Sequence, residues 1–110
     1  MNFYIGNSVD EIDRQEANVE FSDELINFIY QMREQVAFDM SKLYKIDPYD
    51  DVEISENDLS QIIEICNYIL DISLLQNYKE LEEGKQMVQD LVEIAHRAMF
   101  RGLGLISIGD

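Results

Sequence analysis

The chain has 110 residues and carries 23 acidic against 8 basic side chains, a formal net charge of −15 at pH 7. Its hydrophobic fraction of 46% is too high for a disordered acidic tail and is enough for one domain, residues 1–110, with a buried core. A negative field of this size repels the phosphates of nucleic acids and anionic lipids. We therefore expect neither nucleic acid nor membrane as a partner.

The negative charge is concentrated in the first two thirds of the chain. Residues 1–77 hold 17 acidic and 4 basic side chains, a net charge of −13, whereas residues 78–110 have a net charge of −2. A localised acidic surface accelerates encounter with a basic protein. The charge pattern thus predicts a cationic protein partner.

Both ends of the chain carry short β-branched or aromatic segments bounded by glycine, which predict strands at residues 3–5 and 103–108. These segments suit pairing with each other, which would form a small sheet from the N- and C-terminal strands. A further short strand is a candidate at residues 19–21.

Helix signals begin after this segment. Ser22 is a suitable N-cap and is followed by two carboxylates, which the positive end of the helix dipole favours, so we predict a helix over residues 23–37. Residues 38–46 predict a short second helix with Asp39 as its cap. It ends at Asp47, because a residue before proline disfavours the helical conformation.

Two longer helices follow. Ser55 opens the first in the manner of a capping box, with Asp58 in place of the usual Glu or Gln. The second begins at Tyr78 or Lys79 and ends at Gly102, a suitable C′ residue for a Schellman motif. The expected fold is mainly α, a domain of three to four helices with a small sheet from the chain ends.

Apolar residues that recur at helical spacing define the expected core. The residues that we expect to be buried are Phe28, Ile29, Met32, Ile62, Ile63, Cys66, Ile69, Leu70, Val88, Leu91, Ile94 and Ala95.

The segment 47–53 carries four carboxylates in seven residues and no basic residue. One interpretation is a solvated loop whose last acids support the next helix. Another is an interface for Lys and Arg side chains, with a tyrosine as its aromatic anchor. The second interpretation predicts a partner-binding site formed by Asp47, Tyr49, Asp50, Asp51 and Glu53.

A twelve-residue calcium loop is a third interpretation of this region. Five oxygen-bearing residues fall at loop positions 1, 5, 7, 9 and 12, namely Asp47, Asp51, Glu53, Ser55 and Asp58. The glycine of position 6 is absent, and an aspartate at position 12 is shorter than the usual bidentate glutamate. We predict no metal ion and no cofactor, while binding of a cation to residues 47–58 stays open.

A second acidic segment follows the N-terminal strand. Its carboxylates belong to Asp10, Glu11, Asp13 and Glu16. A solvated segment alone would explain these carboxylates. If they lie beside residues 47–53, however, the two segments would form one continuous negative face. We therefore include them as candidate partner-binding residues, although the sequence does not place the two segments together.

One cysteine and one histidine are the candidate catalytic groups. A thiol nucleophile needs a nearby base and an oxyanion hole. Cys66 lies in an apolar helical stretch and is expected in the core, while His96 lies toward the polar side of its helix. We therefore expect no enzyme, and a small enzyme using Cys66, His96 and a carboxylate would require their close approach. A lone cysteine and no predicted signal peptide favour the cytoplasm.

Several segments, taken with the acidity, resemble the small acidic immunity proteins encoded beside bacterial polymorphic and contact-dependent toxins. The segments are Asn2-Phe3-Tyr4-Ile5-Gly6, Phe38-Asp39-Met40, Asp47-Pro48-Tyr49-Asp50-Asp51 and Gly104-Leu105-Ile106-Ser107-Ile108-Gly109. The resemblance also covers the size, the low cysteine content and the helical pattern. It implies a stoichiometric inhibitor that blocks a cognate basic toxin domain such as a nuclease. The alternative is an intracellular regulatory or adaptor module without a toxin partner, and the oligomeric state is left open.

Overall fold

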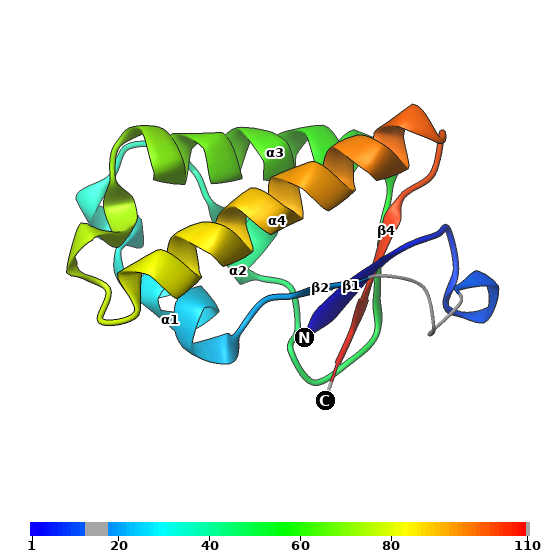
Figure 1. Ribbon diagram of the computed structural model, residues 1–110, viewed down its shortest axis with the longest axis horizontal. Helices are drawn as coiled ribbons and strands as arrows, with labels where there is room; N and C mark the ends of the chain where they lie inside the picture. The colour runs from blue at the N-terminus through cyan, green and yellow to red at the C-terminus, as the bar shows by residue number, and fades with distance from the viewer. Residues whose placement is uncertain (13–17, 110) are drawn as a thin grey trace.

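The computed structural model describes residues 1–12 and 18–109 (Figure 1). The described chain contains a four-stranded sheet at one end and helices that pack against one of its faces (Figure 1). Its elements are β1 (Asn2–Ile5), β2 (Val19–Glu20), α1 (Asp23–Gln31), α2 (Ser41–Tyr44), β3 (Val52–Ile54), α3 (Glu56–Asp71), α4 (Leu81–Phe100) and β4 (Leu105–Ile108). Short 3-10 turns lie at Val9–Glu11, Arg33–Gln35 and Leu74–Asn77. The mainly α class is therefore confirmed.

The sheet is antiparallel, with strand order β2-β1-β4-β3. The two terminal strands pair at its centre, where Phe3 lies opposite Ser107 and Ile5 opposite Leu105. The expectation of a sheet made from the chain ends alone is incomplete, because β2 and β3 flank them. β2 corresponds to the candidate strand at residues 19–21, whereas β3 lies in a segment for which the sequence predicts only a loop.

Strand β3 has a carboxylate between two apolar side chains. Val52 and Ile54 fall on the inner face and Glu53 on the outer face, which is the period-two pattern of a half-buried strand. Its backbone completes the ladder of β4, with Ile54 opposite Leu105. Residues 47–53 are therefore a turn that leads into a strand.

A small apolar contact covers part of the outer face of the sheet, the face opposite to the helices. Ile106 is fully buried although its side chain lies on the face opposite to the helices. A Cβ added to Gly6 would touch both Ile12 and Ile106, so the segment after β1 folds back over this face. The Asn7 side-chain oxygen fixes that segment by accepting from the Gly104 N–H at 2.9 Å.

Helices α3 and α4 pack side by side and run in opposite directions (Figure 1). Ser55 caps α3 as expected, since its hydroxyl accepts from the Asp58 N–H at 3.4 Å. Helix α4 ends in the predicted Schellman motif: Gly102 has φ +70°, and the Leu103 N–H donates to the Ala98 carbonyl at 2.9 Å.

Helix α1 begins as predicted, with the Ser22 hydroxyl accepting from the Leu25 N–H at 3.2 Å, but it ends at Gln31 and not at residue 37. Arg33 lies just beyond this end. Its guanidinium turns back to donate to the Tyr30 carbonyl at 2.8 Å, and the chain continues as a 3-10 turn.

Helix α2 is also shorter than the predicted residues 38–46. Phe38 is held outside it by stacking on Tyr68, with ring centroids 4.6 Å apart. Asp39 is not the predicted cap, because Met40 is the N-cap of α2 and makes no side-chain capping bond. The Asp39 carboxylate accepts from the Ser41 N–H at 2.9 Å just before the helix. This hydrogen bond, together with one from the Ser41 side chain, lowers the pKa of Asp39.

The core agrees largely with the helical stripes. Nine of the twelve expected residues are buried, whereas Phe28, Met32 and Leu70 are partly buried at its edge. Phe28 packs there against Tyr78, with ring centroids 5.1 Å apart. Among the described residues, no helix has both the length and the apolar character needed to cross a membrane.

Candidate partner-binding surface

The acidic turn, residues 47–51, is shaped by its own carboxylates. The Asp47 carboxylate accepts from the Tyr49 N–H at 2.9 Å, and the Asp50 carboxylate accepts from the Asp51 N–H at 2.8 Å. Such local bonds are the usual reason for aspartate in turns. All these acidic side chains remain exposed, so they shape the turn and present negative charge at once.

This turn is fixed to the end of the central strand β4. Asp51 accepts from the Gly109 N–H at 3.1 Å. A Cβ at Gly109 would collide with the backbone of Asp50, so only glycine lets the turn approach this closely. The acidic turn is thereby held against the sheet.

The described part of the second acidic segment lies beside β3. The Val9 N–H donates to the Glu53 carboxylate at 3.3 Å, across 44 positions of sequence. Asp10 and Glu11 follow directly and are exposed. The structure therefore brings these two acids to Glu53, while Asp13 and Glu16 lie outside the described residues.

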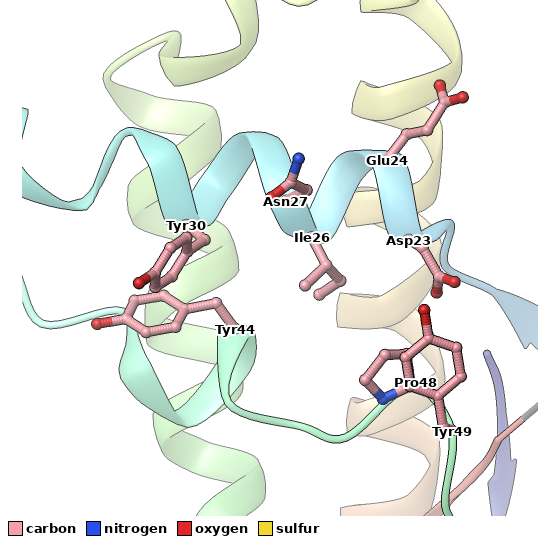
Figure 2. A pocket seen from close by; sticks show the side chains of 8 residues that line it. All are labelled: Asp23, Glu24, Ile26, Asn27, Tyr30, Tyr44, Pro48 and Tyr49. Atoms are coloured by element: carbon pink, nitrogen blue, oxygen red, sulfur yellow. The ribbon is translucent and has the colours of Figure 1, made fainter.

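Beside the turn lies an open groove of about 480 Å³ between α1 and residues 48–49 (Figure 2). Ile26 forms its base. Tyr30 and Tyr44 stand at one end, their rings 5.3 Å apart and nearly perpendicular, and Pro48 and Tyr49 stand at the other. The remaining lining residues are Asp23, Glu24 and Asn27.

Acidic side chains accompany the aromatic rings of this groove. Asp23 lies on the Tyr49 side, whereas the Glu24 side chain points away from the turn (Figure 2). Tyr49 is 76% exposed, so most of its ring is available to a partner. The sequence identified Tyr49 but missed Tyr30 and Tyr44. An exposed tyrosine opposite the apolar stripe of α1 was the available signal for Tyr30.

Carboxylates beside aromatic rings suit a cationic side chain. A Lys or Arg head group is attracted by both, and its alkyl chain can lie on apolar surfaces such as Ile26 and Pro48. One face of the Tyr30 ring is occupied by a guanidinium of this chain, with the Arg33 Cζ 3.7 Å from the ring centroid. The groove is therefore a candidate site for a cationic side chain.

The calcium-loop interpretation assumed one loop between two helices. In the structure, β3 and the first turn of α3 occupy the second half of residues 47–58. Asp58 forms an ion pair with Lys42 at 3.1 Å. Across residues 1–12 and 18–109, no three His, Cys, Asp or Glu side chains are grouped so that they could hold a metal ion.

The candidate catalytic groups lie in different surroundings. Cys66 is fully buried in α3, and burial raises the pKa of its thiol to about 12. His96 is exposed on α4, where it lines an open cleft with Ile5 and Phe100. Because the thiolate is the nucleophilic form, Cys66 stays unreactive near neutral pH.

The buried thiol should make stability fall at alkaline pH. An unfolded thiol ionises near pH 9.0, whereas the folded one holds its proton to about pH 12. Between these values the unfolded state binds fewer protons, so each pH unit lowers the free energy of unfolding by about 1.4 kcal/mol. Urea unfolding above about pH 9 should show a shallower decline for Cys66→Ala than for the wild type. Parallel pH profiles would contradict this.

Comparisons of the chain with protein-family models, with curated proteins and with solved structures found no significant match.

Proposed function

We propose that this protein is a stoichiometric inhibitor of a basic protein, and that it serves in the cytoplasm as an immunity protein against a cognate toxin domain such as a nuclease. The observation that carries the proposal is the acidic turn beside a groove with aromatic ends. A net charge of −15 supports a cationic partner. The toxin is suggested by the resemblance to acidic immunity proteins.

Binding would proceed in two stages. The acidic residues Asp10, Glu11, Asp50, Asp51 and Glu53 attract the partner, which raises the association rate. A partner Lys or Arg side chain then enters the groove between Tyr44 and Tyr49, and Tyr49 is buried against the partner. Burial of this ring slows dissociation. The bound protein covers the active site or an essential surface of the toxin.

The proposal assigns no catalytic residue, metal ion or cofactor. It is supported by the raised pKa of the Cys66 thiol and by the position of His96 in a separate, open cleft. An inhibitor of this kind acts by occupying its partner, so inhibition is complete at a fixed molar ratio of inhibitor to partner.

Affinity capture from the native cell with mass spectrometry tests the proposal. One abundant basic protein should be recovered by the wild type and depleted with Tyr49→Ala, while Ile72→Ala, an exposed apolar control on the end of α3, should retain it. A toxin reading frame next to the gene would separate the immunity role from the adaptor alternative.

Inhibition of the captured partner should reach its limit at a fixed molar ratio. It should survive Cys66→Ser and His96→Gln in folded variants, because neither residue has a part in binding. If a catalytic amount inactivated excess partner, or if either substitution removed inhibition without unfolding the protein, the proposal would be wrong.

A further inference from the structure

Strand β3 has a free side at the edge of the sheet. It is the outermost strand in the order β2-β1-β4-β3, so within residues 1–12 and 18–109 no strand pairs with its other side. The ladder between β1 and β4 shows which backbone groups face that side. Gly6 and Gly104 continue its register, and the Gly6 N–H donates to the Gly104 carbonyl at 3.0 Å. Opposed pairs in an antiparallel ladder alternate between bonded and non-bonded, so Leu105 directs its N–H and C=O toward β3.

The outward groups of β3 belong to Glu53. Ile54 lies opposite Leu105 and bonds to it, because Leu105 faces β3. Glu53 lies opposite Ile106, whose own backbone groups face β1. The Glu53 N–H and C=O therefore point away from β4, and no described residue bonds to them. Unpaired groups at a sheet edge are a template for an added extended segment. We call this side of residues 52–54 the β3 edge.

A pocket of about 380 Å³ opens beside the β3 edge, between the strand and helices α2 and α3. Its apolar lining comes from Ile46, Val52, Ile54 and Ile62. Lys42 and Asp58 also line it and form an ion pair at 3.1 Å, while Lys45 adds a positive charge. Successive side chains of a strand point to opposite faces, so every second side chain of an added strand would point into this pocket. Apolar side chains suit it, and basic ones do not.

The opposite face of the β3 edge is acidic. Glu53 points to this outer face, where it accepts from the Val9 N–H at 3.3 Å and has Asp10 and Glu11 beside it. A residue directly opposite Glu53 on an added strand would place its side chain on the same face. A Lys or Arg side chain would be attracted there, and a carboxylate would be repelled. The β3 edge of a second copy is therefore disfavoured, because it would place Glu53 against Glu53.

We infer that the β3 edge binds an extended segment of the basic partner as a fifth, antiparallel strand with an apolar–basic–apolar sequence. The basic residue pairs with both backbone groups of Glu53 and places its charge on the acidic face. Its two apolar neighbours point toward the pocket. The acidic turn directly precedes β3, so one partner can contact both surfaces. The identity of that partner rests on the proposed function, whereas the β3 edge itself is tested with a peptide.

The probe is a capped heptapeptide with the central sequence Val-Lys-Val between pairs of threonines. Titrated into the nitrogen-15-labelled protein, it should shift the amide resonances of Glu53 and Ile54 in a saturable way. The same peptide with glutamate in place of lysine should bind at least about fivefold more weakly, because like charges across a strand pair are unfavourable.

Methylation of single peptide nitrogens tests the backbone pairing. A methyl group on the lysine nitrogen removes the donor that faces the Glu53 carbonyl, so saturable shifts should disappear. A methyl group on the nitrogen of the first valine is the matched control, because this nitrogen points away from the protein and binding should remain.

The matching substitutions in the protein are Glu53→Pro and Glu53→Ala. Both remove the carboxylate, but only proline removes the outward N–H, which the ladder with β4 does not use. With Ile54 as the reporter, Glu53→Ala should bind the peptide within about fivefold of the wild type. Glu53→Pro should not bind it. If Glu53→Pro does not fold, the methylated peptides decide the question on the wild-type protein.

Equal binding of the lysine-methylated peptide and its control would overturn the inference, as would the absence of any saturable shift at Glu53. Failure of the proposed function gives a different result. In that case the Val-Lys-Val peptide would bind as described, but affinity capture would recover no basic protein. A captured basic partner without peptide binding would contradict the β3 edge alone.

Discussion

Replacing Leu91 with alanine is expected to lower the free energy of unfolding by about 2–5 kcal/mol, the range for truncating a fully buried leucine. Leu91 is fully buried on α4, the helix that packs against α3. The contact between these two helices joins the helical layer to the sheet, because α4 also lies on β1 and β2. Urea unfolding followed by circular dichroism would measure the loss.

Ile72→Ala is the control for this substitution, since it removes an aliphatic side chain that is 43% exposed. We expect it to change the free energy of unfolding by less than about 0.5 kcal/mol, as most surface substitutions do. Equal losses in the two variants would mean that the α3–α4 contact does not dominate stability.

Tyr49→Ala is expected to weaken the complex with the captured basic partner by about 2 kcal/mol, roughly thirtyfold in the dissociation constant. The change should appear mainly as faster dissociation, because the side chain is uncharged and adds little to long-range attraction. Since Tyr49 is 76% exposed in the free protein, its loss should leave folding intact.

Tyr49→Phe provides the matched control, because it keeps the ring and removes only the hydroxyl. Surface plasmon resonance on the three proteins would separate the rates. Should Tyr49→Ala bind as tightly as the wild type, the groove would not hold the partner. The region of Asp10, Glu11 and Glu53 would then be the next surface to test.

Local signals in the sequence were sufficient for most helices. The α3 and α4 stripes recur at helical spacing, and Ser22, Ser55 and Gly102 mark helix ends with specific hydrogen-bonding roles. Helix α1 was predicted too long because the helical spacing of apolar residues does not reveal the change to a 3-10 turn after Met32.

Strand β3 was missed because its identity depends on a distant partner. Val52 and Ile54 are only two apolar residues next to a run of acids, which on its own favours a solvated loop. Pairing with β4, more than 50 positions away, completes the backbone hydrogen bonds and buries Ile54. Pairing with β4, and not the local sequence, therefore determines that residues 52–54 form a strand.

The candidate site was predictable in composition but not in arrangement. The carboxylates and Tyr49 are evident in the sequence, whereas the groove needs Tyr30 and Tyr44 from two separate helices. The position of Asp10 and Glu11 beside β3 depends on the bond from Val9 to Glu53. Contacts between such distant residues produce no periodic pattern in the sequence from which they could be predicted.

Association kinetics with the captured partner at increasing ionic strength test the proposed binding of a basic protein most directly. The informative variant is Asp50→Asn/Asp51→Asn, because asparagine keeps the oxygens that accept from the Asp51 and Gly109 N–H groups and removes only the charge. We predict that the wild-type association rate falls steeply with salt. The double variant should associate more slowly at low salt, with a weaker salt dependence. An association rate that salt leaves unchanged, or the same salt dependence in both proteins, would contradict recognition through the acidic turn.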